Sequence, residues 1–127
     1  MSDYTIVNLR EAEDMAPKFG MAPEVEARFP KRELGCRIGA VSLQGLAPNA
    51  RQPFGHRHAN QEELYVILNG GGRVKLDDDV VEVRPMDAVR ISPPVVRAFE
   101  AGPEGLELLV FGPRAPGDAE IVRDVAW

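Results

Sequence analysis

Residues 55–70, GHRHANQEELYVILNG, carry both histidines of the chain and its longest unbroken apolar run, Leu64–Leu68. His56 and His58 are two residues apart, and side chains alternate across a β-strand, so this spacing puts both imidazoles on one face. Four residues separate His58 from Glu63, which opens the apolar run. A bend in these four residues would return Glu63 to the histidine face. The stretch therefore predicts two strands with three donor groups gathered between them.

Short apolar segments separated by turn residues recur along the rest of the chain, which is typical of an all-β sandwich or barrel. The expected strands are Leu34–Leu46, Glu63–Asn69, Arg73–Asp77, Val80–Arg84, Ala88–Ile91, Val96–Glu100 and Leu106–Phe111. Residues 69–72 (NGGG) and 77–79 (DDD) tolerate a positive φ and predict tight hairpin turns. Neighbouring strands are therefore expected to pair antiparallel.

The length of 127 residues fits one domain, residues 1–127, with its own core. Prolines punctuate residues 1–33, which we expect to form an irregular N-terminal arm containing a helical turn or two within Leu9–Met15. The barrel itself is expected over residues 34–112. Residues 113–127 are expected to be a C-terminal loop and tail, with Ala119–Trp127 packing back or forming an edge strand.

The charge balance argues against two classes of partner. Fifteen basic and twenty acidic residues give a formal net charge of −5, so no positive field attracts nucleic acid or anionic membrane surfaces. The one cysteine, Cys36, cannot form an internal disulfide. The first residues lack the basic and apolar stretches of a secretory signal. We therefore expect a soluble, cytoplasmic protein.

Two imidazoles and a carboxylate, from His56, His58 and Glu63, form a donor set that suits iron(II), manganese, nickel or zinc. Such a set leaves coordination positions open for a substrate or oxygen. The alternative is structural: paired histidines on a strand also occur as surface or packing residues, and a glutamate at a strand entrance is usually solvated.

The pattern His56-x-His58-x4-Glu63-x6-Gly70 resembles the first motif of the cupin superfamily, with Ala50 in place of the motif's leading glycine. The resemblance runs from about Leu34 to Phe111 and is closest to small single-domain bacterial cupins. It implies an all-β fold, a small antiparallel double-stranded β-helix or jelly-roll barrel. It also implies that the two histidines and the glutamate lie inside the barrel as metal ligands.

The second cupin motif is not matched. Its positions fall here on Met86, Ser92, Pro94, Arg97 and Ala101, so that Arg97 replaces the histidine that usually completes the ligand set. A guanidinium is always charged and only donates hydrogen bonds, so it cannot bind a cation.

Arg97 leaves three arrangements open. In the first, its side chain turns outward or pairs with a carboxylate such as Glu26 or Glu100. In the other two it points inward. An inward Arg97 would offer Glu63 a bidentate partner beside a three-ligand metal site. Together with His56 and His58 it would otherwise form a cationic nest for an anionic ligand.

Two further residues are candidates for ligand binding beside Arg97. Tyr65 shares its strand face with Glu63, so its phenol is expected inside the barrel, where a ligand or the backbone must supply a hydrogen-bond partner. Gln61 lies in the bend and either contacts a ligand or caps the turn.

Three functions remain open from the sequence. The first is a metal-dependent cupin enzyme, with dioxygenase or isomerase chemistry on a small organic molecule implied by the resemblance. The second is a metal-free module that binds an anionic small molecule through Arg97. The third is a structural or regulatory dimer. A homodimer is expected in each case, because the edges of a small barrel need cover and the arm is placed to give it.

Overall fold

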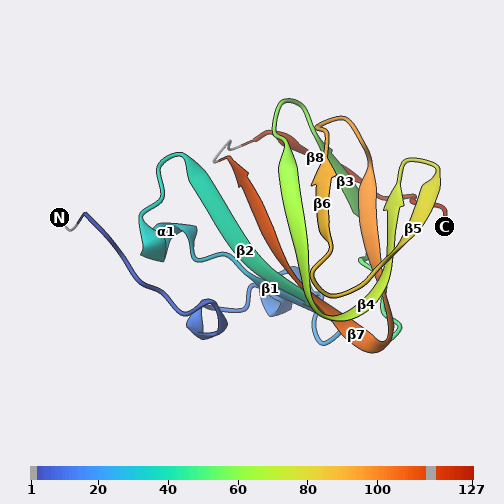
Figure 1. The fold of residues 1–127 in the computed structure, drawn as a ribbon, viewed down its shortest axis with the longest axis horizontal. Helices are drawn as coiled ribbons and strands as arrows, with labels where there is room; N and C mark the ends of the chain where they lie inside the picture. The colour runs from blue at the N-terminus through green and yellow to red at the C-terminus, as the bar shows by residue number, and fades with distance from the viewer. Residues whose placement is uncertain (1–2, 114–116) are drawn as a thin grey trace.

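The computed structural model describes residues 3–113 and 117–127, and most of them form one curled antiparallel sheet (Figure 1). The strands are β1 (Val25–Arg28), β2 (Gly39–Leu46), β3 (Gly55–His58), β4 (Glu63–Leu76), β5 (Asp79–Val83), β6 (Ala88–Ile91), β7 (Arg97–Pro113) and β8 (Ala119–Val122). One short helix, α1 (Lys31–Leu34), and two 3₁₀ turns, η1 (Leu9–Glu11) and η2 (Ala16–Phe19), lie in the N-terminal part. The all-β prediction is confirmed.

Two long strands organise the sheet. β7 pairs antiparallel with β2, β3 and β4, while β4 also pairs with β5 and β6. In Figure 1 both long strands turn at the lower edge of the view, so that the sheet folds over and its two halves face each other. The space between the halves holds the core, and the histidine strand β3, paired with β7 and β8, is part of the sheet that encloses it.

Glycines allow the long strands to bend together. The β4–β7 register shifts between Ile67 and Asn69 and again between Gly70 and Gly72. A Cβ atom at Gly72 would lie 1.9 Å from the carbonyl oxygen of Glu100 in β7, and Gly70 has a φ of 72°. Only glycine permits the close approach at Gly72 and favours the positive φ at Gly70.

The predicted hairpin turn at residues 69–72 is therefore wrong. Residues 63–69 and 73–77, expected as two strands, form the single strand β4, and the strands expected at 96–100 and 106–111 merge into β7. The glycines bend a continuous strand, because its hydrogen bonds to β7 resume on both sides of the bulges. The turn at Asp77 is confirmed: it has a φ of 53° and joins β4 to β5.

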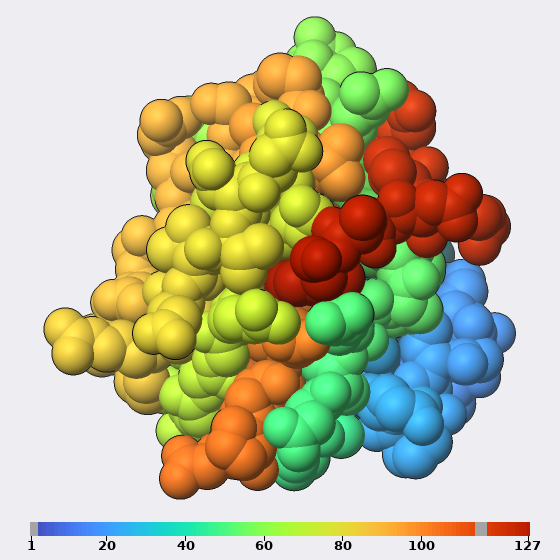
Figure 2. Space-filling model, turned by 90° about the vertical axis from the view of Figure 1, so that its right-hand side faces the viewer, coloured from blue at the N-terminus to red at the C-terminus, as the bar shows by residue number. Residues whose placement is uncertain are grey.

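The two ends of the chain are more regular than expected. Within residues 1–33, β1 pairs with β2, and the 3₁₀ turn η1 falls inside the predicted helical segment. The expected edge strand in the C-terminal tail is β8, which pairs with β3. Beyond it the C-terminal segment crosses the surface (Figure 2), and Trp127 stacks on the guanidinium groups of Arg51 and Arg73 at 5.0 and 5.7 Å.

Inward-facing residues of the strands form the core, in the alternating pattern of a half-buried sheet. Tyr65, Ile67, Val74, Ile91 and Phe99 are at most 2% exposed. Three ionisable side chains, those of His58, Glu63 and Arg97, are buried beside them. Buried charges require partners, so these three residues point to the site.

We predict that Gly72→Ala destabilises the protein, because the new methyl group would collide with the β7 backbone at the bend. The free energy of unfolding, measured by urea denaturation, is expected to fall by about 1–3 kcal/mol. Gly39→Ala in β2 is the matched control, since a Cβ there meets no atom within 4 Å. Equal unfolding midpoints for the two variants would contradict this account of the bend.

Candidate metal centre in the barrel

Strand β3 places both histidines inside the barrel. β3 lies between β7 and β8, with His56 opposite Arg97 and His58 opposite Ala119. The two rings lie edge to face with centroids 5.2 Å apart, and the side chain of His58 is 7% exposed. Arg57, between them, points outward and pairs with Glu120, as the alternation of a strand requires.

Glu63 completes the predicted cluster. It is the first residue of β4, and its carboxylate oxygens lie 3.2 Å from His56 Nε2 and 3.3 Å from His58 Nε2. One donor atom from each of the three residues lies within 4.8 Å of the other two. The sequence-based expectation that a bend returns Glu63 to the histidine face is therefore confirmed.

The bend itself is held by a residue that the sequence did not identify. Asp118, just before β8, accepts hydrogen bonds from the backbone N–H groups of Asn60 and Gln61 at 3.1 and 2.8 Å. Its Oδ2 atom lies 3.2 Å from Nδ1 of His58. No motif marks an aspartate 55 residues beyond Glu63, and only the pairing of β8 with β3 brings it there.

Tyr65 faces the interior as predicted, and its hydroxyl donates a 2.5 Å hydrogen bond to Glu63 Oε1. Burial acts to raise the pKa of Glu63, but hydrogen bonds from His56 and Tyr65 and attraction by both imidazoles lower it below its ordinary value. Burial, followed by the adjacent Glu63 charge, raises the pKa of Tyr65 well above its usual range. Glu63 is thus held as a carboxylate and Tyr65 as a neutral donor.

Arg97 points inward and is 0% exposed, so the outward arrangement is wrong. The carboxylates of Glu26 and Glu100, offered as partners for an outward Arg97, pair with other arginines. The terminal nitrogens of Arg97 donate to the carbonyl oxygens of Pro93 and Ser92 at 3.3 and 3.4 Å.

The bidentate pairing of Arg97 with Glu63 is absent from the described residues. Instead a single atom, Arg97 Nε, lies 3.8 Å from Glu63 Oε1 and makes no hydrogen bond within the described structure. The guanidinium turns its fork toward the backbone of the preceding loop, which leaves only this one edge toward the carboxylate.

A cavity of about 250 Å³ opens onto the cluster. His56, His58, Glu63 and Tyr65 line it together with Gln44, Gln52 and apolar side chains, namely Met21, Val25, Ala27, Phe29, Pro53, Phe54, Ala119 and Ile121. Gln61 lies beside Glu63 on a neighbouring hollow of about 300 Å³, and Arg97 lines neither space. The structure thus brings Tyr65 to the cluster of His56, His58 and Glu63 and places Gln61 and Arg97 at its margins.

The cluster fits a divalent transition metal ion. Two imidazoles and a carboxylate are ligands that such ions prefer. Neither ring nitrogen of the buried His58 makes a well-aligned hydrogen bond within residues 3–113 and 117–127, although both lie close to carboxylates. A cation between Nε2 of His58 and the carboxylate of Glu63 would give both of these groups a partner.

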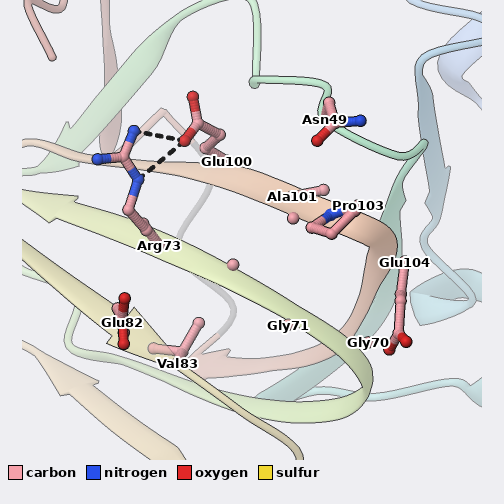
Figure 3. Close-up of a pocket in the computed structure, with 12 residues that line it drawn as sticks. Asn49, Gly70, Gly71, Arg73, Glu82, Val83, Glu100, Ala101, Pro103 and Glu104 are labelled. Carbon is pink, nitrogen blue, oxygen red and sulfur yellow. Dashed lines mark hydrogen bonds and ion pairs between the residues drawn. The ribbon is translucent and has the colours of Figure 1, made fainter.

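A second hollow, of about 520 Å³, lies between β4, β5 and β7 (Figure 3). The side chain of Arg73 pairs there with Glu100, which Arg51 also contacts. These charges satisfy one another, and the metal-donor cluster found among the described residues lies elsewhere.

Comparison with known proteins agrees with the fold. A family model described as Cupin domain matches residues 42–112, and the chain belongs to this family. Uncharacterized protein MJ1618 of Methanocaldococcus jannaschii is 30% identical over 83 residues, or 63% of this chain and 66% of that protein, just under two thirds of its length.

Two solved structures show the same fold. The crystal structure of a cupin protein from Bacteroides fragilis has a TM-score of 0.73 and 24% identity, covering 92% of this chain and 89% of that one. The structure of the polyketide cyclase RemF from Streptomyces resistomycificus has a TM-score of 0.77 and 21% identity, covering 97% of this chain and 87% of that one.

We predict that Tyr65→Phe raises the pKa of Glu63, because the buried carboxylate loses a donor. At neutral pH the free energy of unfolding should fall by about 1.5–3 kcal/mol, the range for a hydrogen bond to a charged group. The folded pKa of Glu63 lies below its ordinary value of 4.5. Its ionisation therefore stabilises the fold above that value, and this contribution is lost as the pH falls through the folded pKa.

The destabilisation by Tyr65→Phe should consequently shrink in acid, which urea denaturation at several pH values measures. Tyr4→Phe, at a side chain 79% exposed, is the control and should have no effect. A loss of stability in Tyr65→Phe that is the same at all pH values would mean that the hydroxyl does not act through the Glu63 charge.

Proposed function

We propose that this cupin binds a small organic molecule in its barrel at a divalent metal ion, iron, manganese, nickel or zinc, held by His56, His58 and Glu63. The observation that carries the proposal is the convergence of three donor atoms within 4.8 Å at the wall of a cavity. An ion held there by three protein ligands supplies Lewis-acid or redox activation of a substrate. Dioxygenase or isomerase chemistry is the catalytic form of this proposal.

The protein's own residues prepare this site. Tyr65 donates to Oε1 of Glu63 and so leaves Oε2, on the His58 side, for the ion. The mainly apolar wall favours a small ligand with apolar parts, because a cavity of about 250 Å³ is small for a ligand pocket. The amides of Gln44 and Gln52 are the polar groups of the wall that would orient such a ligand.

Three residues extend the proposed ligand site. Tyr65 contacts a bound ligand directly, since it lines the same cavity as the metal donors. Gln61 acts from the neighbouring hollow, which shares Glu63 with it. Arg97 acts through its charge, because it lies behind Glu63 and does not reach the cavity surface.

A second candidate is metal-free binding of an anionic small molecule, with a regulatory or structural dimer as its non-catalytic form. The observation in its favour is the buried Arg97, whose Nε makes no hydrogen bond within the described structure. A small carboxylate or phosphate drawn between the imidazoles would face this cation. The metal site is preferred because the arginine is set back from the cavity.

We predict that tag-free protein binds one divalent ion per chain and that His56→Ala abolishes this binding, because two ligands rarely retain a transition metal that three hold. Elemental analysis after purification and titration of the metal-free protein measure it. Arg57→Ala is the matched control, since Arg57 is the outward neighbour on the same strand. It should bind as the wild type does.

Metal-free protein that takes up none of the four ions would contradict the first proposal. If its melting temperature then rose with carboxylates or sugar phosphates, and Arg97→Ala removed the rise, the second candidate would be supported, since a ligand of the folded state raises that temperature.

The proposal also includes a homodimer in the cytoplasm. Leu64 and Phe111 are cross-strand partners on the outer face of β4 and β7, and they are 43% and 37% exposed. Val41 of β2 adjoins Phe111 on that face, which gives an apolar surface that a second copy can cover.

A cytoplasmic location is in keeping with the single cysteine. No helix of the described residues has the length and hydropathy to cross a membrane.

We predict that Phe111→Glu converts a two-chain species into a single chain, because the charge would be buried in the apolar interface. Light scattering after size exclusion measures the mass. Ile38→Glu, at a side chain 84% exposed, is the control and should leave the mass unchanged. A wild-type mass of one chain would contradict the dimer.

A further inference from the structure

The side chain of Asp118 lies beside the cluster of three donors and is not one of them. Its side chain is 7% exposed, and it lies in the loop that enters β8. Its carboxylate accepts from the N–H groups of Asn60 and Gln61 and from the side-chain amide of Asn60, and its carbonyl accepts from Ala59. One residue thus holds three of the four residues between His58 and Glu63, namely Ala59, Asn60 and Gln61.

The same carboxylate faces the ring of His58. Asp118 Oδ2 lies 3.2 Å from Nδ1, and Glu63 Oε2 lies 3.3 Å from Nε2, so the imidazole stands between two carboxylates. A neutral imidazole has one N–H group and one lone pair. If Nδ1 carries the proton toward Asp118, the lone pair of Nε2 faces Glu63, and the two repel unless a cation lies between them.

His56 provides an internal comparison. Its Nε2 also faces Glu63, at 3.2 Å, but within residues 3–113 and 117–127 Glu63 is the only carboxylate with which it pairs. His58 therefore has a second partner that His56 lacks. The pairing of β8 with β3, in which Ala119 is opposite His58, fixes the position of that partner.

We propose that Asp118 is a positioning residue of the metal centre. In the metal-loaded site it would accept the Nδ1 proton of His58, from which it lies 3.2 Å away but out of line in the structure, and so present the Nε2 lone pair to the ion. The same carboxylate holds the turn that brings Glu63 opposite. This inference rests on the proposed metal-binding function. A carboxylate behind a histidine ligand fixes the tautomer and the ring orientation and makes the ligand more basic.

Zinc alone is the probe for the first test. The affinity of metal-free protein for Zn²⁺ is measured by competition with a chromophoric chelator. Asp118→Asn keeps the shape of the side chain but removes its charge and half of its acceptors. It is expected to weaken Zn²⁺ binding about 10- to 100-fold, the usual effect of losing such a partner.

Two control variants separate the ring from the turn. Asn60→Ala loses a hydrogen bond of the same turn without touching His58, and Glu120→Gln alters an exposed carboxylate of β8. Both should bind Zn²⁺ as the wild type does. Equal weakening by Asn60→Ala and Asp118→Asn would overturn the positioning role, because holding the turn would then account for the effect.

The second readout is the ring itself. The chain has two histidines, so the ¹⁵N-labelled ring spectrum of the zinc-loaded protein contains two spin systems. The wild type should show a protected Nδ1 proton on His58, and Asp118→Asn should lose that protection while the His56 signals stay in place. An unprotected Nδ1 proton in the wild type would overturn the inference.

The two proposals fail in different ways. Wild-type protein that binds no Zn²⁺ or other divalent ion overturns the metal-binding function and this inference with it. Wild-type protein that binds Zn²⁺ with an affinity unchanged in Asp118→Asn overturns the role of Asp118 alone.

Discussion

The close antiparallel pairing of β4 with β7 is the constraint on which the rest of the molecule depends. Both strands bend at the same place, where Gly72 lets the backbones approach to a distance that no side chain would allow. The bend folds one sheet into two facing halves and leaves an open end. Glu63 begins β4 and Arg97 begins β7, so both charged residues enter the barrel at that end.

The site gathers buried ionisable groups around Glu63. Glu63 accepts a hydrogen bond from Tyr65 and lies near His56, His58 and Arg97. The ring nitrogens of His58 and the Nε of Arg97 make no hydrogen bond within the described structure. Burial of an unpaired carboxylate would be costly. The same contacts that make the carboxylate tolerable in the core also aim it at the imidazoles.

The all-β fold could be predicted from the short apolar segments that recur between turn residues, and the site from residues 55–70, because a two-residue histidine spacing places both rings on one face of a strand. The gathering of His56, His58 and Glu63 followed from that local pattern. The continuity of β4 and β7 could not be predicted, because glycines are equally compatible with a turn and with a bulge, and only long-range pairing decides between them. Asp118 could not be predicted either, since its role depends on the pairing of two strands distant in sequence.

The burial of Arg97 has a consequence for how this family member can change in evolution. A guanidinium keeps its charge at every pH at which proteins fold, and removing the partner of a buried charge costs about 3–5 kcal/mol. A lineage that replaced Glu63 with a neutral residue would leave the buried Arg97 cation without the nearby negative charge. Positions 63 and 97 are therefore expected to covary among descendants, with a neutral residue or a histidine returning at 97 wherever the acid at 63 is lost.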